Sequence, residues 1–454
     1  MANTISNPAD ASVTGGGLRA TPENYVSLAN LIDPTKPDVR DLYVQTYGDQ
    51  GITGFLELTG AKKNAGTSDK VEWYEEGRLH KTVTFTGLEN SVVTVGDNDP
   101  VVVRLNDVLL FSNGVRAVVT DQDTSNVTFT VANLDGSALA DLDTPNSGTA
   151  AIIGNIYGQG SNQPSSFYQT GLKKRENPYL ITKEMYEVSG SQATNLGWLN
   201  VNGQYMWYMK NEMDTRKRFM NQREMMLMYS EVADGALGGV TVGTDSKIVG
   251  SQGYFSAVEE RGITATVSGG AQGSFASMSD IDSIILELDK EGAPAEYAMY
   301  VNRATSLDID DMLANGIATQ VTAGLAGQFG AFNNDADMAV QLGFKSFTRG
   351  GYTFHKHDWK LLNDPTLGGL NNIHKGAMVP MTQVVDAKSG VKAPALEMNY
   401  KAAGNYSREM EHWVTGGGVL GHSNAANGKD TAVFNYRSEC NLVTRAANQH
   451  VVIK

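Results

Sequence analysis

Residues 204–230, QYMWYMKNEMDTRKRFMNQREMMLMYS, are the stretch that decides the fold. Large apolar side chains recur in it at the spacing of an α-helix: Met206, Met209, Met213, Phe219, Met220, Met226 and Leu227. Charged residues occupy many of the other positions. The pattern predicts one helix over about 204–234, roughly 45 Å long at 1.5 Å per residue. We expect its methionine stripe to face a core and its charged sides to lie at the surface of a domain.

Strand patterns precede this helix. The run 178–190, PYLITKEMYEVSG, is typical of a strand and leads toward the helix. Further upstream, from 71 to about 160, the sequence is almost purely of β type: the runs 81–86 and 126–131 alternate apolar and polar residues, with turn sequences between the runs. We therefore predict a small β-barrel or sandwich over about 85–155, inserted into a longer hairpin.

Helix and strand patterns alternate after the long helix. Ser279 or Asp280 is expected to cap a helix over 281–290, and 295–301 has the apolar character of a buried strand. A second short helix is predicted over 307–314, ended by the Asn-Gly pair that follows it. This order predicts an α+β domain over about 246–350.

Strand patterns return in the last third of the chain. They include 352–357, 376–381 and the final run 435–453, which is apolar enough to belong to a sheet. The fold class predicted for the whole chain is therefore α+β.

The overall composition limits the classes of function. The formal net charge of −14 argues against a uniformly basic nucleic-acid-binding protein. Glycine supplies 49 of the 454 residues, about 11%, against roughly 7% in average proteins. This excess favours many turns and loops, as in a β-rich protein.

The single cysteine, Cys440, permits no intrachain disulfide and no cysteine-cluster zinc site. The first residues lack a basic segment followed by an apolar run, so we expect no signal peptide. No apolar stretch approaches the roughly 20 residues that span a bilayer. We expect a soluble protein that is made in a cytosol and has no membrane partner.

Two groups of polar residues are candidates for chemistry. His355 and His357 share one face of a predicted strand, but a metal ion would need a third ligand, and none is indicated. Glu75 and Glu76 are adjacent, so in a strand they point to opposite faces and make a poor acid–base pair. A salt bridge from these acids to Arg78 or to a neighbouring chain is the favoured interpretation.

Glycine runs and basic clusters are the other candidates. The runs 235–239 and 416–418 lack the Lys-Ser/Thr ending of a phosphate-binding loop and are interpreted as turns. The clusters 173–175, Lys-Lys-Arg, and 216–218, Arg-Lys-Arg, are short and lie near acids, which favours solvated or inter-subunit faces. We predict no catalytic, cofactor-binding or metal-binding residues, and no enzyme.

Three short motifs and the order of elements carry a resemblance to a known family. The motifs are 187–190, Glu-Val-Ser-Gly, before the long helix; 362–365, Leu-Asn-Asp-Pro, followed by 376–381, Gly-Ala-Met-Val-Pro-Met; and the closing 447–450, Ala-Asn-Gln-His. With them, the chain resembles the major capsid protein of tailed double-stranded DNA bacteriophages, which has the Hong Kong 97-type fold. The resemblance covers nearly the whole chain.

The resemblance implies a division of the chain into an N-terminal arm, an extended loop that carries the β insertion, a peripheral domain with its spine helix, an axial domain, and a return to peripheral strands. The N-terminal arm corresponds to 1–49 and the extended loop to 50–177, with the insertion at about 85–155. The peripheral domain corresponds to 178–245, with the helix at about 204–234, and the axial domain to 246–350. Residues 351–454 are the return to peripheral strands, and part of this segment is left open to assignment to the axial domain.

The same resemblance implies a structural role. Many copies would assemble as hexamers and pentamers into an icosahedral shell, made in the host cytoplasm and forming the virion capsid. The shell would enclose double-stranded DNA without sequence-specific readout. A separate scaffolding protein, a portal and a decoration protein are the implied partners, and no cofactor is implied.

Some family members link a loop lysine covalently to a neighbouring subunit. Lys62, Lys63 and Lys70 are the possible donors here, but the sequence indicates no acceptor. We therefore expect non-covalent locking of the shell.

Other classes of protein remain open. One is a different virion component, such as a tail tube, decoration or fibre protein, and another is an encapsulin-like compartment shell. A β-rich carbohydrate-active enzyme would need two carboxylates roughly 5–10 Å apart in a cleft lined with aromatic residues. The tryptophans are scattered along the chain, which gives that class little support: Trp73, Trp198, Trp207, Trp359 and Trp413.

Overall fold

The computed structural model describes residues 62–64, 68–89, 91–95, 103–123, 127–135, 147–164, 167–168, 170–191, 200–201, 204–205, 207–232, 250–322, 346–367, 373–385, 390, 392–404, 406–416 and 429–454. The predicted N-terminal arm, 1–49, lies outside these residues. Contacts divide the chain into two compact units, which we call the insert unit, Trp73–Arg175, and the body, which is the rest of the chain. Among the described residues, no helix has both the length and the apolar character needed to cross a membrane.

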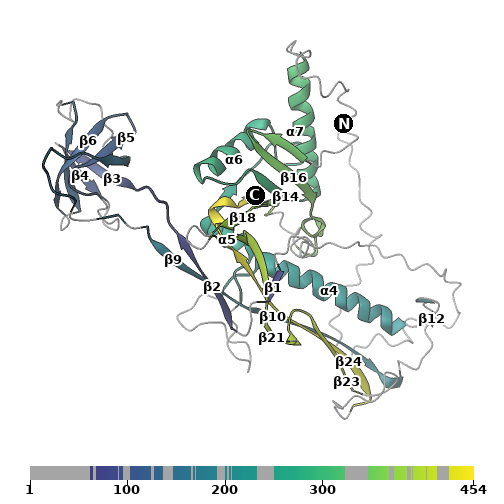
Figure 1. The fold of residues 1–454 in the computed structure, drawn as a ribbon. Coiled ribbons are helices and arrows are strands. Elements are labelled where there is room, and N and C mark those ends of the chain that lie inside the picture. Colours follow the sequence, from purple (N-terminus) through teal and green to yellow (C-terminus); the bar gives the residue numbers. More distant parts are fainter. Residues whose placement is uncertain are drawn as a thin grey trace. The chain divides into compact units, whose positions relative to one another are not determined.

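The insert unit contains a closed six-stranded barrel in the order β3-β4-β7-β6-β5-β8 (Figure 1). Its strands are β3 (Thr82–Glu89), β4 (Val92–Val95), β5 (Asp107–Phe111), β6 (Arg116–Asp123), β7 (Thr128–Asn133) and β8 (Gly148–Asn155). Alternate residues of β3 and β4 are buried, as the period of two in the sequence predicts. Of the two predicted architectures, barrel and sandwich, the structure has the barrel.

Apolar side chains fill the barrel. Phe85 and Phe111 meet edge to face, with ring centroids 5.6 Å apart and planes at 79°. Around them pack valines and other apolar residues from the barrel strands and the segment before β5: Val83, Val93, Val95, Val103, Leu109, Ala117, Val119, Phe129, Val131 and Ala150. The interior of the barrel is therefore a packed apolar core.

A two-stranded ribbon leads into and out of the insert unit. It consists of β2 (Lys70–Glu76) and β9 (Leu172–Pro178). Beyond the strands, the amide of Gly77 donates to the carbonyl oxygen of Gly171 at 2.9 Å. None of the apolar core clusters among the described residues includes a residue of β2 or β9. The ribbon is therefore held by backbone hydrogen bonds and charged pairs and lacks a core of its own.

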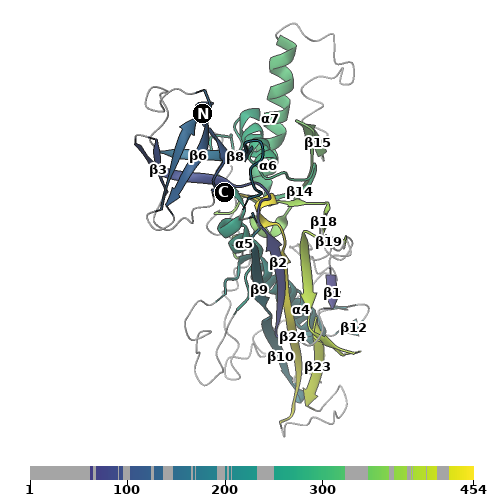
Figure 2. The same ribbon diagram turned by 60° about the vertical axis from the view of Figure 1, so that its left-hand side comes forward.

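The first sheet of the body, which we call sheet A, is long and narrow (Figure 2). Its order is β1-β20-β24-β10, and β23 also pairs with β24. The bounds are β1 (Lys62–Asn64), β10 (Leu180–Ser189), β20 (Leu396–Tyr400), β23 (Glu411–Gly416) and β24 (Thr431–Thr444). β10 and β24 are antiparallel and pair from Leu180 with Cys440 to Ser189 with Thr431.

Helix α4 (Trp207–Tyr229) lies along β10 and β24 (Figure 1). It is shorter than the predicted 204–234. Gln204–Tyr205 forms strand β12, which pairs with β11 (Asn200–Val201). At the other end, the amide of Gly253 donates to the carbonyl oxygen of Ser230 at 2.6 Å, and Val232 forms a bridge with Gly250. This pairing with residues 250–253 takes the chain out of the helical path.

The predicted apolar stripe of α4 is buried only in part. Its members Phe219 and Leu227 are buried, whereas Met213 is 50% exposed and Met220 is 42% exposed. The buried positions of α4 are Thr215, Phe219, Arg223, Glu224, Leu227 and Met228. Phe219 packs in a cluster with sheet A, whereas Leu227 and Met228 pack against the aromatic residues of α5 (Tyr254–Arg261). The prediction was wrong for the methionines because the buried face includes polar side chains with partners in the body. The guanidinium of Arg223, for example, donates to the carbonyl oxygen of Glu409 at 3.2 Å.

The second sheet of the body, sheet G, has the order β13-β25-β17-β14-β16-β15. Its strands are β13 (Ile263–Ala265), β14 (Glu296–Val301), β15 (Ser346–Arg349), β16 (Tyr352–Asp358), β17 (Gly376–Pro380) and β25 (Val451–Ile453). β14 is parallel to β16 and antiparallel to β17, and all but its first residue are buried, in agreement with the predicted buried strand.

Two helices pack with sheet G in one apolar cluster. α6 (Met278–Lys290) begins earlier than predicted, because Ser277 is its N-cap and Asp280 completes a capping box. α7 (Arg303–Thr322) is much longer than the predicted 307–314. The side chain of Asn302 accepts a hydrogen bond from the amide of Thr305 at 2.8 Å and so opens the helix early. The helix also continues past Gly316, where glycine costs only about 1 kcal/mol.

Most strands of the last third belong to one of the two sheets. The exceptions are two small hairpins, β18 (Gln383–Val385) with β19 (Lys392–Pro394) and β21 (Ala402–Ala403) with β22 (Tyr406–Ser407). β16, β17 and β25 belong to sheet G, whereas β20, β23 and β24 belong to sheet A. One apolar cluster joins the sheets, since it contains Ala298 and Tyr300 of β14 together with Met398 of β20 and Leu442 of β24. The body is therefore built on a core that continues from one sheet to the other.

Candidate functional site

The two histidines proposed as a possible metal pair have other contacts. His357 in β16 stacks on the ring of Tyr300 at 5.3 Å between centroids and 25° between planes. Burial lowers the pKa of His357, and the nearby His355 lowers it further. Between the histidines, Lys356 forms a 2.6 Å ion pair with Asp310. No group of His, Cys, Asp and Glu side chains among the described residues could hold a metal ion.

Glu75 and Glu76 are separate charges on the ribbon. Glu75 accepts hydrogen bonds from Trp73 Nε1 at 3.0 Å and from Arg175 Nε at 3.3 Å. Glu76 accepts one from the hydroxyl of Thr170. Glu75 thus forms a salt bridge with Arg175 of β9 across the ribbon, a partner that the sequence did not predict, and the pairing with Arg78 or a neighbouring chain stays a prediction.

In each of the two basic clusters one arginine has an ion-pair partner: Arg175 pairs with Glu75, as described above. Arg218 of α4 lies 3.5 Å from Glu184 of β10. Lys70, one of the possible cross-link donors, contacts Glu176 at 2.6 Å and Glu72 at 2.8 Å. The bond to Glu176, followed by that to Glu72, raises the pKa of Lys70, which keeps its amine protonated and a poor nucleophile. Lys62 and Lys63 lie in β1, which pairs with β20.

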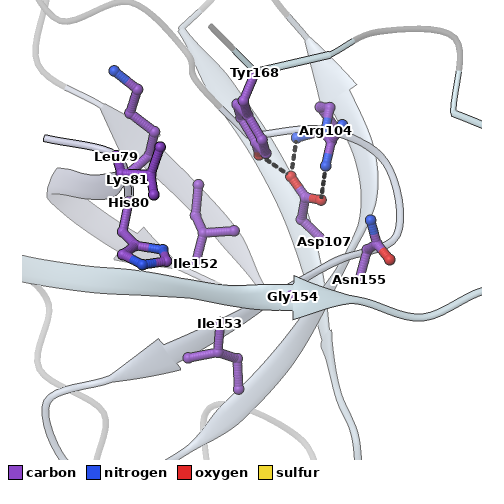
Figure 3. Close-up of a pocket in the computed structure, with 10 residues that line it drawn as sticks. All are labelled: Leu79, His80, Lys81, Arg104, Asp107, Ile152, Ile153, Gly154, Asn155 and Tyr168. Carbon is purple, nitrogen blue, oxygen red and sulfur yellow. Dashed lines mark hydrogen bonds and ion pairs between the residues drawn. The ribbon is translucent and has the colours of Figure 1, made fainter. Parts of the chain in front are cut away.

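The insert unit has a shallow pocket of about 200 Å³ beside the barrel (Figure 3). At one side of it, the buried carboxylate of Asp107 accepts hydrogen bonds from the backbone and guanidinium of Arg104, at 2.7 and 3.3 Å, and from the hydroxyl of Tyr168. The guanidinium also lies 4.0 Å from the centre of the Tyr168 ring. Burial, followed by the bond to Asp107, raises the pKa of Tyr168. These groups satisfy one another, so they fasten residue 168 to the barrel.

The face of sheet A that points away from α4 carries the more open surface. Glu184 faces α4, so alternation along β10 directs Lys183 and Met185 to the other side. Met185 is 58% exposed and Trp413 is 39% exposed. A groove of about 420 Å³ runs here, lined by Lys183, Glu184, Met185, Trp413, Asn435, Tyr436 and Arg437. We call it the sheet A groove.

Sequence reasoning missed this groove. Its residues come from three strands, and Met185 and Trp413 lie far apart in the chain. The period of two along β10 is a signal that Lys183 and Met185 share a face, but nothing in the sequence pairs that face with Trp413. Arg437 does so in the structure, since its guanidinium lies 5.0 Å from the Trp413 ring and pairs with Glu411.

Comparisons with known proteins give matches at the level of solved structures. No protein-family model and no curated protein matches the chain. The capsid structure of the cyanophage P-SCSP1u is similar at 8% identity and a TM-score of 0.40, over 96% of this chain and 98% of that chain. The mature capsid of bacteriophage PhiM1 is similar at 7% identity and a TM-score of 0.38, over 93% and 91%. The capsid of a native GTA particle is similar at 10% identity and a TM-score of 0.36, over 94% and 95%. With TM-scores below 0.5, these similarities carry no argument, and we base the function on the chain's own elements.

Proposed function

We propose that this chain is a major capsid protein, the structural subunit of an icosahedral phage-type shell. The observation that carries the proposal is the order of elements in one chain. A coreless ribbon with an inserted barrel leads into a long strand paired with β24; helix α4 then lies on these strands, and a second α+β sheet follows. This is the order that the motifs of the Hong Kong 97-type family implied.

The body supplies the rigid part of such a subunit. Helix α4 packs on sheet A through Phe219, Val188 and Tyr436, and the main core continues into sheet G. Interiors packed in this way deform little. A shell needs such a part because each copy must present the same contact geometry to its neighbours.

The ribbon supplies the part that reaches a neighbour. A two-stranded sheet is at best marginally stable alone, and three strands or a packed face are needed for independent stability. β2 and β9 contribute nothing to any core cluster of the described residues. Tyr74 of β2 is 67% exposed and Leu172 of β9 is 68% exposed. We propose that these side chains are covered by another copy of the chain.

The sheet A groove fits the same role. Apolar side chains exposed side by side on a protein usually mark an interaction surface. Met185 and Trp413 form such a surface beside the cations Lys183 and Arg437. We propose that the groove is buried between subunits in hexamers and pentamers.

The net charge of the chain and the ion pairs of Lys70 support two further features of the proposed role, which are the enclosure of DNA and the non-covalent locking of subunits. The net charge of −14 favours a shell that encloses double-stranded DNA without binding it tightly. The ion pairs of Lys70 favour non-covalent locking of the subunits. Scaffolding, portal and decoration proteins would be the partners, with the virion as the location. The domain division stated for the sequence is part of this proposal.

Assembly of the purified chain tests the proposal. The wild-type protein, concentrated to tens of micromolar with a crowding agent, is expected to form hexameric or pentameric rings far heavier than its 48.8 kDa, visible by negative-stain microscopy, whereas closed shells of uniform size should need the scaffolding protein. Met185→Glu places a charge in the sheet A groove and is expected to lower the assembled fraction at least tenfold.

The matched control is Ser283→Glu, which adds the same charge at an exposed position of α6. It is expected to assemble as the wild type does. A wild-type chain that stays monomeric in sedimentation throughout this range, with or without a crowding agent, would contradict the proposed function.

A further inference from the structure

The junction between the ribbon and sheet A contains a buried asparagine with an unusual set of contacts. Asn177, at the end of β9, is 1% exposed. Its Nδ2 donates to the carbonyl oxygens of Gln252 at 2.9 Å and Leu442 at 2.6 Å. Its Oδ1 accepts from the hydroxyl of Ser251 at 3.1 Å and from the amide of Gln252 at 2.8 Å.

These contacts use the whole capacity of one carboxamide. An asparagine side chain has two N–H donors and one oxygen with two lone pairs, and all of them have partners here. The backbone carbonyl of Asn177 also accepts a 2.9 Å hydrogen bond from the side chain of Asn441. No other side chain of similar size offers two donors and two acceptor sites in this arrangement.

The partners of Asn177 come from distant parts of the sequence. Gln252 is 75 residues away and precedes α5, whereas Leu442 is 265 residues away and lies in β24. Asn177 therefore ties the end of the ribbon to two separate segments of the body. The bonds with Leu442, Ser251 and Asn441 are buried, so the loss of any of them would leave an unsatisfied polar group, at about 1–3 kcal/mol.

The other strand of the ribbon, β2, is attached to the body near the same junction, by a backbone hydrogen bond and by ion pairs. The carbonyl oxygen of Asp69, just before β2, accepts a hydrogen bond from the amide of Tyr179 at 3.3 Å. The carboxylate of Asp69 lies 2.6 Å from the amine of Lys401, which also contacts Glu439 at 3.4 Å. Both strands are thus attached to the body where they leave it.

We infer that Asn177 is a positioning residue for assembly. It fixes the path of β9 into β10, so that every copy of the chain carries its ribbon into assembly from the same starting geometry. The inference rests on the proposed function, because the need for a fixed path comes from the repeated contacts of a shell. A subunit in which this junction frays would have to order it during assembly, at a cost of about 1–2 kcal/mol for each residue that becomes fixed.

Substitution of the full-length chain tests this inference. Asn177→Asp keeps the size of the side chain but places carboxylate oxygens against the carbonyl oxygens of Gln252 and Leu442. Asn177→Ser removes most of the contacts without adding charge, and it serves if the aspartate variant does not fold. Both variants are expected to exchange backbone amides at 172–181 at least tenfold faster than the wild type, measured by mass spectrometry, with the barrel amides at 82–155 unchanged.

Assembly gives the functional readout. We expect the Asn177 variants to lose at least tenfold in assembled fraction while they remain folded monomers. The matched control is Thr305→Asp, which buries the same charge in α7, at a residue that is 0% exposed and lies in the helix that packs with sheet G. It is expected to lower the unfolding free energy but to assemble, once folded, with the wild-type yield.

The outcomes separate this inference from the proposed function. Wild-type yields of assembly for folded Asn177→Asp and Asn177→Ser, or unchanged exchange at 172–181, would overturn the positioning role. Equal loss of assembly in Thr305→Asp would assign the effect to stability alone and overturn it as well. If the wild type itself does not assemble, the proposed function fails, and positioning for assembly fails with it. Exchange at 172–181 would then still report whether Asn177 fixes the path of the strand.

Discussion

The insert unit and the body fill their interiors by different means. The barrel has a core of apolar side chains, and Asp107 is the one buried polar side chain among the described residues of the insert unit. The body buries charged and amide side chains among its apolar clusters, including Glu397, Glu439, Asn177, Asn441 and His450. Both regions are rich in β-strands, but only the body buries many polar side chains.

The two kinds of interior differ in how many substitutions each tolerates without loss of structure. Apolar cores tolerate many substitutions so long as volume and pattern are kept. Buried polar networks are stable only when every member has its partner, and a partly satisfied network is costly. An inserted module of the first kind can fold through local contacts, whereas the body depends on pairs that close over hundreds of residues, such as Asn177 with Leu442.

The largest expected effect is in the barrel. Phe111→Ala removes a ring that is 2% exposed and packs on Phe85, and should cost the barrel about 3–5 kcal/mol. Peptide-resolved hydrogen exchange on the full chain should show faster exchange across 82–155 and unchanged exchange in β10 and β24. The control, Val92→Ala, alters a side chain that is 38% exposed and should have little effect. Equal loss of protection in sheet A would break the comparison, because the two interiors would then be one cooperative unit.

A smaller effect is expected from a charged pair in the body. Glu397 contacts Arg445 through both oxygens, at 3.0 and 3.4 Å, and its side chain is 5% exposed. Glu397→Gln leaves the guanidinium without its counter-charge. Since Arg445 keeps 20% exposure, we expect a loss of about 2 kcal/mol in urea-induced unfolding, below the cost for a fully buried pair.

The control for this pair is an ion pair at the protein surface. Lys290 and Glu287 lie 2.6 Å apart with side-chain exposures of 64% and 52%. Lys290→Ala should change the unfolding free energy by about 0.5 kcal/mol or less. If the two substitutions had equal effects, the buried charges of the body would contribute no more than surface pairs.

The smallest expected effect is a dependence of the body on pH. His450 is fully buried, with Nδ1 3.2 Å from the hydroxyl of Tyr254 and Nε2 3.2 Å from the carbonyl oxygen of Arg445. Burial lowers its pKa to about 3, and the positive charge of Arg261 acts in the same direction, while the bond to Arg445 opposes it. The unfolded chain therefore takes up a proton below about pH 6.5 that the folded chain does not.

The sign follows from this difference in proton uptake. The contribution of His450 is complete above pH 6.5 and is lost as the pH falls from 6.5 toward 3. Between pH 7 and 5.5, the body should lose about 1 kcal/mol of unfolding free energy through this residue. Urea unfolding of the wild type and His450→Gln across this range measures it, and the variant should show the shallower slope. An identical slope in both would exclude His450 as the source.

Local patterns predicted much of the chain. The period of two in 81–86 and 126–131 predicted strands β3 and β7 because one face of each is buried in the barrel. The apolar run at 295–301 predicted β14 because a strand covered on both faces leaves no polar alternation. The helical spacing of apolar residues in 204–230 predicted that α4 exists and that Phe219 and Leu227 are buried, but it wrongly placed Met213 and Met220 in the core.

One cause explains both the predictions that succeeded and those that did not. Spacing along the chain reports which residues share a face, and so the sequence by itself determined the strands of the barrel and the presence of α4. The single cysteine also determined that the chain has no intrachain disulfide. Which face is covered depends on what packs against it. Arg223 and Glu224 are buried in α4 and Met213 is half exposed because the body brings partners such as the carbonyl of Glu409 to one side of the helix. Only the tertiary structure decided which face of α4 is buried, which sheet each of the last strands joins, and which groups contact Asn177. Each of these outcomes depends on contacts with residues far away in the sequence.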